Sequence, residues 1–177
     1  LVECAGRPLL SWSLAALAAV PQLTEIVVAL PDGVDADAVL PDGVTAVVGG
    51  VERSHSVRAA LAAVAGDHDV VLIHDAARPL ITAAEIRRVL GALSSAEVDG
   101  ATAAAPVTDT IKVVESDGVT VARTLDRGSL WSIQMPQACR RPILELELEQ
   151  HGAGLAGGRP GASEMHTTDH ERVYGRR

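Results

Sequence analysis

Apolar and polar positions alternate along the first 150 residues in a way that predicts short strands and helices in turn. Apolar runs, most of them rich in β-branched residues, predict strands at 24–30, 44–48, 70–73 and 100–107. Apolar residues at helical spacing predict helices at 8–20, 56–64, 82–93 and 142–150. The run at 70–73 is short and unbroken, which favours a strand buried on both faces of a parallel sheet. The pattern therefore predicts one compact α/β domain.

A cluster of polar residues, His74-Asp75-Ala76-Ala77-Arg78-Pro79, directly follows the predicted strand at 70–73. Ligands of open α/β sheets bind just beyond the carboxyl ends of strands, so Asp75 and Arg78 are expected at the rim of a site. A carboxylate there can hold a divalent metal or sugar hydroxyls, and a guanidinium can hold a phosphate. The alternative is that Asp75 and Arg78 only pair with each other and cap the next helix, and the spacing leaves both interpretations open.

A second candidate site lies at Gly49-Gly50, directly after the predicted strand at 44–48. Glycines at this position allow the backbone to approach a ligand closely. Ser54 is a candidate N-cap for the following helix, and Ser56 in its first turn would face the same edge of the sheet. The segment is neither a Walker loop nor a dinucleotide fingerprint, so an ordinary glycine turn before a helix is the alternative.

Residues 108–115 and 119–125 predict two strands around the turn Ser116-Asp117-Gly118. A hairpin inserted into such a framework is usually a projecting arm, which we place at 108–127, and arms commonly make dimer contacts. From 151 to 177 the periodicity disappears, and this tail is expected to be poorly ordered.

Composition excludes several classes of protein. The formal charge of −8 argues against a nucleic-acid binder, and no apolar run approaches the ~20 residues that span a bilayer. The start of the chain has no signal-peptide pattern, and Cys4 and Cys139 are too few for a disulfide framework or a zinc site. A cytoplasmic protein is the economical interpretation. Aromatic residues are 2% of the chain, so backbone groups would have to read most of any bound nucleobase.

Several motifs, taken together and in order, resemble the 2-C-methyl-D-erythritol 4-phosphate cytidylyltransferase family over about residues 1–150. The matching elements are Gly6-Arg-Pro-Leu-Leu-Ser-Trp-Ser13, Gly49-Gly50-x-x-Arg53-x-x-Ser56-Val57, His74-Asp-Ala-Ala-Arg-Pro79, Pro106-Val-x-Asp109-Thr110-Ile-Lys112, Thr124-Leu-Asp126-Arg127 and Leu130-Trp131-x-x-Gln134-x-Pro136-Gln137. The resemblance implies a Rossmann-like α/β nucleotidyltransferase fold, with a mostly parallel sheet and a projecting β-hairpin arm that builds a homodimer.

The resemblance also implies a reaction, in which methylerythritol phosphate attacks the α-phosphate of CTP and releases pyrophosphate, with Mg²⁺ present. By this likeness Gly49, Gly50 and Ser56 line the cytidine pocket, while Asp75 and Ala76 form the ribose region and Asp75 is the metal ligand. Arg78, Thr110 and Arg127 bind the methylerythritol phosphate, and Arg127 is the catalytic residue that positions it. Thr110 and Arg127 belong to the arm and are expected to act across the dimer.

The chain departs from the family pattern in three places. Family members carry a first strand and a glycine-rich basic loop ahead of the segment matched here, and a second lysine near the C-terminus, and neither is found in this sequence. Met135 stands where the family has threonine. We therefore expect a nucleotidyltransferase domain at 1–150 without its first strand and loop, and severely impaired catalysis. A pentitol-phosphate cytidylyltransferase and a non-catalytic, dimerising remnant are the alternatives.

Overall fold

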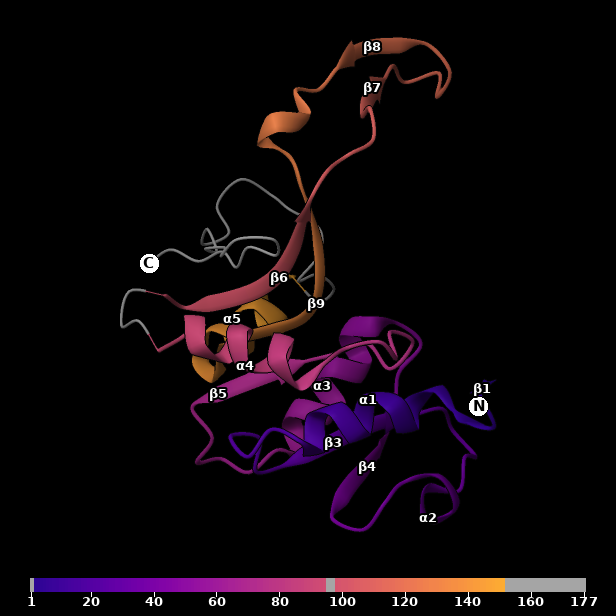
Figure 1. Cartoon of the computed structure of the whole chain (residues 1–177), viewed down its shortest axis with the longest axis vertical. Coiled ribbons are helices and arrows are strands. Elements are labelled where there is room, and N and C mark those ends of the chain that lie inside the picture. The colour runs from indigo at the N-terminus through magenta and orange to yellow at the C-terminus, as the bar shows by residue number, and fades with distance from the viewer. Residues whose placement is uncertain (1, 95–97, 152–177) are drawn as a thin grey trace.

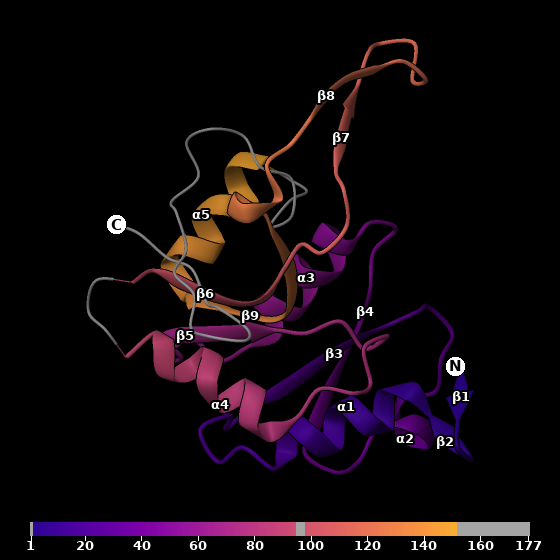
Figure 2. The same cartoon turned by 45° about the horizontal axis from the view of Figure 1, so that its top comes forward.

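Three layers make up the part of the chain that the computed structural model describes, residues 2–94 and 98–151. Helices α1 and α4 cover one face of the strands, and α3 and α5 cover the other (Figures 1 and 2). The helices are α1 (Leu9–Ala18), α2 (Ala36–Val39), α3 (Arg53–Ala63), α4 (Ala83–Ala92), α5 (Arg141–His151) and the 3-10 turn η1 (Arg127–Ser129). The strands are β1 (Glu3–Cys4), β2 (Arg7–Pro8), β3 (Ile26–Leu30), β4 (Val44–Val48), β5 (Val70–Ile73), β6 (Gly100–Pro106), β7 (Lys112–Val114), β8 (Val121–Thr124) and β9 (Trp131–Arg140).

Most of the predicted elements are confirmed, and β4 and β5 have the predicted bounds. One helix start is wrong: α3 begins at Arg53, with Glu52 at its N-cap, so Ser54 lies within the first turn and caps nothing. The tail predicted to be poorly ordered lies outside the described residues from 152 onward. Within residues 2–94 and 98–151, no helix combines the length and the apolar composition that crossing a membrane requires.

Strand pairing does not confirm the expectation of a mostly parallel sheet. In the described part of the chain only β3 and β4 form a parallel pair, whereas β5 and β6 each pair antiparallel with β9, which lies between them. The sequence interpretation did not assign β9 as a strand, because Pro136 indicates a stop, although apolar and polar residues alternate over 131–135. Since β5 and β6 both run against β9, they point in the same direction, and β9 is what makes the pairing antiparallel.

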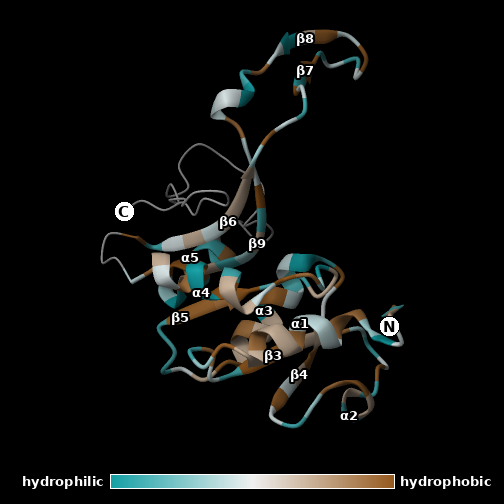
Figure 3. Ribbon diagram, in the orientation of Figure 1, coloured by the Kyte–Doolittle hydropathy of each residue, from teal (hydrophilic) through white to brown (hydrophobic). Residues whose placement is uncertain are grey.

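The core follows the side-chain alternation of the central strands. Ala138 of β9 faces α4 and packs in a cluster with Val89 and Leu93. The next residue, Cys139, faces the other side and packs with Leu61 of α3 and Leu144 of α5. Figure 3 shows the hydrophobic (brown) colouring of β5, which lies between these layers of helices. Consecutive residues of one strand therefore supply both apolar clusters, as the two-residue period of a strand requires.

A hollow separates β3 from β5. Glu25 and His68, which precede the two strands, are 3.0 Å apart. Beyond the other ends, Asp75 after β5 lies 3.1 Å from Arg53, which follows β4, the parallel partner of β3, so β3 and β5 run in the same direction. Neither β3 nor β5 is hydrogen-bonded to the other among the described residues, since β3 pairs with β4 and β5 with β9. A cavity of about 350 Å³ lies between them, lined by apolar side chains that include Val28 and Val71.

β5 was predicted to be buried on both faces, and this hollow leaves it only partly buried. Val70 is 36% exposed, and Val71, Leu72 and Ile73 are only partly buried. Both faces of β5 do contact helices, but its free edge opens into the cavity.

Strands β7 and β8 form the predicted arm, which extends away from the layered body (Figures 1 and 2). Its turn is held by Asp117, whose carboxylate accepts hydrogen bonds from the backbone N–H groups of Val119 and Thr120 at 2.9 and 2.8 Å. The Thr120 hydroxyl, together with these two N–H groups, lowers the pKa of Asp117. Gly118 adopts a φ of 71°, which glycine tolerates best.

Candidate active site

The glycine turn after β4 is folded onto the first turn of α3. The Gly50 N–H donates to Ser56 Oγ at 3.1 Å, and the Gly49 N–H donates to the Leu30 carbonyl at 2.7 Å. A Cβ atom on Gly50 would lie 2.2 Å from the Cβ of His55, so no larger residue fits this backbone without a shift. The structure thus brings Gly49, Gly50 and Ser56 together as predicted.

The loop after β5 is closed by its own backbone and by His74. The Arg78 N–H donates to the Asp75 carbonyl at 2.9 Å, and His74 Nε2 lies 3.1 Å from the Arg78 carbonyl. Because a carbonyl only accepts, the proton of His74 is on Nε2. Burial lowers the pKa of His74, so the ring is neutral, and its buried Nδ1 has no hydrogen-bond partner in the described part of the chain. His74 therefore fixes the loop that presents Asp75, Ala76 and Arg78.

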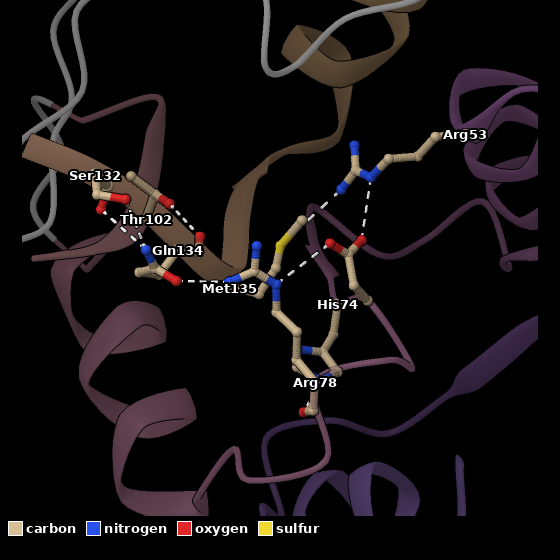
Figure 4. Close-up of polar contacts among 8 residues, drawn as sticks. Arg53, His74, Arg78, Thr102, Ser132, Gln134 and Met135 are labelled. Carbon is tan, nitrogen blue, oxygen red and sulfur yellow. Dashed lines mark hydrogen bonds and ion pairs between the residues drawn. The ribbon is translucent and has the colours of Figure 1, made fainter. Parts of the chain in front are cut away.

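Five side chains, which we call the arginine ring, connect this loop to α3 and β9: Arg53, Asp75, Arg78, Gln134 and Met135. Asp75 Oδ1 lies 3.1 Å from Arg53 Nε, and Asp75 Oδ2 lies 3.6 Å from Arg78 Nε. Arg78 Nη1 donates to Gln134 Oε1 at 2.6 Å, and Arg53 Nη2 lies 4.0 Å from the sulfur of Met135 (Figure 4). Since Gln134 and Met135 are consecutive on β9, these contacts form a closed ring.

The position of Gln134 in the ring is fixed by its neighbours. Its Nε2 donates to Ser132 Oγ at 2.9 Å, and its backbone carbonyl accepts from Thr102 Oγ1 at 3.1 Å (Figure 4). Thr102 is 1% exposed, so this anchor belongs to the core. The ring is therefore tied to the central strand of the sheet and not only to surface loops.

The alternative interpretation of Asp75 and Arg78 is correct in one respect. They do form an ion pair, but they do not cap α4, because Thr82 and Glu85 form the predicted capping box there. The Glu85 N–H donates to Thr82 Oγ1 at 3.2 Å, and the Thr82 N–H donates to Glu85 Oε2 at 2.6 Å. Asp75 and Arg78 are thus free of any role in helix capping.

The arm residues do not join the ring within one chain. Thr110 and Arg127 are exposed, and Arg127 Nη1 donates to the Thr108 carbonyl at 2.8 Å. Thr110 lies in the connection between β6 and β7, and Arg127 is the first residue of η1. In Figure 1 this connection and η1 lie apart from β5 and α3. The predicted site residues therefore fall into two groups, one on the body and one on the arm.

Asp75 was predicted as a metal ligand. No group of three or more His, Cys, Asp or Glu side chains that could hold a metal occurs in residues 2–94 and 98–151. Both oxygens of Asp75 face guanidinium groups. A single carboxylate nevertheless fits Mg²⁺ when phosphates supply other ligands, since Mg²⁺ is often bound by one or two carboxylates and substrate phosphates.

Arg53 and Gln134 were present in the sequence motifs, but sequence reasoning gave them no role. Arg53 lies three residues before Ser56 on α3, a spacing that places two side chains on the same face of a helix. That spacing was the available signal for Arg53. Gln134 had no comparable signal, because β9 was not assigned as a strand.

Comparison with known proteins agrees with this geometry. The family model described as 2-C-methyl-D-erythritol 4-phosphate cytidylyltransferase matches residues 1–167. Curated relatives with that name include one from Deinococcus radiodurans, 43% identical over 157 residues, and one from Halorhodospira halophila, 44% identical over 163 residues. Each comparison covers 86% of this chain but only 63% and 65% of the relatives, so the chain spans less than two thirds of their length.

A solved structure of similar fold has the same name. The crystal structure of 2-C-methyl-D-erythritol 4-phosphate cytidylyltransferase from Thermus thermophilus is 30% identical, with a TM-score of 0.69. The likeness covers 88% of this chain and 72% of that one. Together with the family match over most of its length, this shows that the chain belongs to the 2-C-methyl-D-erythritol 4-phosphate cytidylyltransferase family.

Proposed function

We propose that the protein transfers CMP from CTP to 2-C-methyl-D-erythritol 4-phosphate, in the non-mevalonate route to isoprenoid precursors. An oxygen of the acceptor phosphate bonds to the α-phosphorus of CTP, while the bond from that phosphorus to the bridging oxygen breaks. Pyrophosphate leaves with the electron pair of that bond. The proposal rests on one observation. The glycine turn and the Asp75–Arg78 loop lie at the same end of the strands, and Arg53 at the start of α3 contacts Asp75.

On the nucleotide side, Gly49, Gly50 and Ser56 would bind cytidine, and Asp75 and Ala76 the ribose. The support is that the glycine turn has no side chain to hold a base away. The Gly50 N–H also donates to the Ser56 hydroxyl, so the turn and Ser56 lie side by side. Ser56, Asp75 and Ala76 also border the hollow at the carboxyl ends of its strands, beyond the part that a strand between β3 and β5 would fill. Asp75 would be one protein ligand of a Mg²⁺ ion, whose positive charge would offset the charge developing between the phosphates.

On the acceptor side, Arg78, Thr110 and Arg127 would bind and position the methylerythritol phosphate, with Arg127 as the catalytic residue. A guanidinium can hold a phosphate through two parallel hydrogen bonds, which fixes the direction of the in-line attack. Because Thr110 and Arg127 lie on the arm, we propose that they act on the site of a second copy in a homodimer. The exposed apolar side chains of the arm support this, since Val119 is 83% exposed and Val121 is 52% exposed.

The domain organisation is also a proposal: the hollow between β3 and β5 would receive the strand that the resemblance places first in the family. Two parallel strands with free facing edges offer hydrogen-bonding groups to a strand between them, and the cavity lining is apolar. The glycine-rich loop that follows that strand in the family would then lie beside Asp75. Without it, catalysis by this chain would be severely impaired. The cytoplasmic location stays a prediction.

The test measures CTP-dependent pyrophosphate release with methylerythritol phosphate and Mg²⁺. It compares this chain with a version extended by an N-terminal strand, a glycine-rich basic loop and a C-terminal lysine segment. Arg127→Ala is made in the extended version. Arg123→Ala is the matched control, because Arg123 lies on the same arm and is exposed. Ribitol 5-phosphate replaces methylerythritol phosphate in a parallel series.

We expect little turnover by this chain, and turnover by the extended version that Arg127→Ala lowers at least a hundredfold and Arg123→Ala leaves nearly unchanged. Rapid turnover by this chain would contradict the expected impairment. Preference for ribitol 5-phosphate would favour a pentitol-phosphate cytidylyltransferase. An extended version that folds but turns over neither acceptor would leave the non-catalytic remnant as the correct interpretation.

A further inference from the structure

Only some of the N–H donors of the Arg53 guanidinium are engaged by strong acceptors among the described residues. A guanidinium has five N–H donors. Arg53 uses Nε on Asp75 at 3.1 Å, and one Nη2 donor on the sulfur of Met135 at 4.0 Å. A thioether is a weak acceptor, so in the described part of the chain only one strong acceptor engages this cation. The side chain is 40% exposed, which leaves its remaining donors open to a ligand.

The location of Arg53 connects it with the proposed nucleotide pocket. Arg53 and Ser56 are three residues apart on α3, and both border the hollow at the carboxyl ends of its strands, where Asp75 and Ala76 also lie. Ser56 Oγ in turn holds the Gly50 N–H. If the base of a nucleotide contacts Ser56 and the glycine turn, the phosphate on its ribose would therefore extend toward Arg53.

The charges of the arginine ring favour an anion. Arg53 and Arg78 share the single carboxylate of Asp75, so one positive charge in this cluster is not compensated. Met135 and Gln134 complete the ring without adding charge. A phosphate group would supply the missing negative charge and would accept from several N–H donors of one guanidinium.

We propose that Arg53 is a nucleotide phosphate-binding residue, and that its guanidinium exchanges Asp75 for the phosphate when the nucleotide binds. This inference rests on the proposed function, because it takes the ligand to be a cytidine nucleotide. Asp75 and the phosphate then compete for Arg53, and release from Arg53 leaves Asp75 available to the ribose or to a metal. Met135 suits this exchange, since its sulfur does not hold the guanidinium tightly.

The experiment compares the affinities of CMP and cytidine for the full chain by isothermal titration calorimetry, in EDTA so that no metal contributes. The ratio of the two dissociation constants isolates the contribution of the phosphate to binding, because base and ribose contacts are common to both ligands. The variants are Arg53→Gln, Arg53→Lys and Asp75→Asn. Arg87→Gln is the matched control, since Arg87 is an exposed arginine of α4 and its replacement makes the same change in charge. Circular dichroism establishes that each variant is folded.

We expect the unmodified chain and Arg87→Gln to bind CMP about tenfold more tightly than cytidine. Arg53→Gln should bind the two ligands equally, with unchanged affinity for cytidine, and Arg53→Lys should regain part of the preference for CMP. Asp75→Asn should increase the preference for CMP, because it removes the group that competes for Arg53. A folded Arg53→Gln variant that keeps the preference would overturn the inference while leaving the proposed function intact.

Equal losses of CMP and cytidine binding in Arg53→Gln would also overturn the inference, since they would indicate that Arg53 only supports the fold of the pocket. If neither the unmodified chain nor the extended version binds CMP, cytidine or CTP, the proposed nucleotide site itself is wrong and the inference fails with it. The first two outcomes are thus separate from failure of the proposed function.

Discussion

Arg78 Nη1 lies 2.6 Å from Gln134 Oε1, a hydrogen bond that joins the loop after β5 to the central strand β9. Gln134 is itself held by Ser132 and by the buried Thr102. Its acceptor is therefore fixed in direction, and it aligns the plane of the guanidinium. Orientation of this kind matters for a residue proposed to bind a phosphate through two parallel hydrogen bonds.

Arg78→Lys should weaken binding of methylerythritol phosphate about tenfold, because an ammonium keeps the charge but cannot donate two parallel hydrogen bonds. The measurement is calorimetric titration of methylerythritol phosphate into the chain in the presence of CTP and Mg²⁺. Arg87→Lys, on the exposed side of α4, should have no effect. Unchanged affinity in Arg78→Lys would remove Arg78 from the acceptor site.

Gly50→Ala should destabilise the fold by about 1–3 kcal/mol, the usual cost of forcing an extra methyl group into filled space. The added Cβ would lie 2.2 Å from the Cβ of His55, so the glycine turn or the start of α3 has to shift. Urea denaturation followed by circular dichroism measures the change in unfolding free energy. Gly66→Ala is the control, because a Cβ on Gly66 meets no atom within 4 Å and should change the stability by only a few tenths of a kcal/mol.

Cys139 should make the stability fall at alkaline pH. Burial raises the pKa of this thiol from 9.0 to about 12 in the folded protein, so the folded state favours the neutral thiol. The resulting stabilisation is fully present below pH 9 and is lost as the pH rises toward 12. The unfolding free energy, measured in urea between pH 8 and about 11.5, should therefore fall less steeply in Cys139→Ala than in the unmodified chain. The same substitution at the exposed Cys4 should leave the slope unchanged, and equal slopes in all three proteins would contradict this assignment.

Local chemistry made much of the fold predictable from the sequence. The capping box at Thr82 and Glu85 and the Asp117-Gly118 turn depend on residues three positions apart or fewer, and both are confirmed. The start of α3 was not predictable in this way. Ser54 is a good N-cap type, but Glu52 holds that position, and Ser54 instead lies buried with its hydroxyl unpaired among the described residues.

The pairing of β9 could not be inferred from local pattern. Its first five residues are exposed or partly buried, and only residues 136–139 are buried. The same limit applies to the site. The sequence indicated that Gly50, Ser56, Asp75 and Arg78 are functional, but the contacts of Arg53 with Asp75 and Met135 join residues 22 and 82 positions apart.

The hollow between β3 and β5 has a consequence for local unfolding of the protein. A continuous sheet transmits cooperativity through its hydrogen bonds, but here none crosses from the β3–β4 pair to the β5–β9–β6 sheet among the described residues. The two parts are connected by helix packing and by the side-chain pairs Glu25–His68 and Arg53–Asp75. Their backbone amides should therefore exchange with solvent as two separate units with different opening free energies, with the β3–β4 unit exchanging first because only one pair of strands supports it.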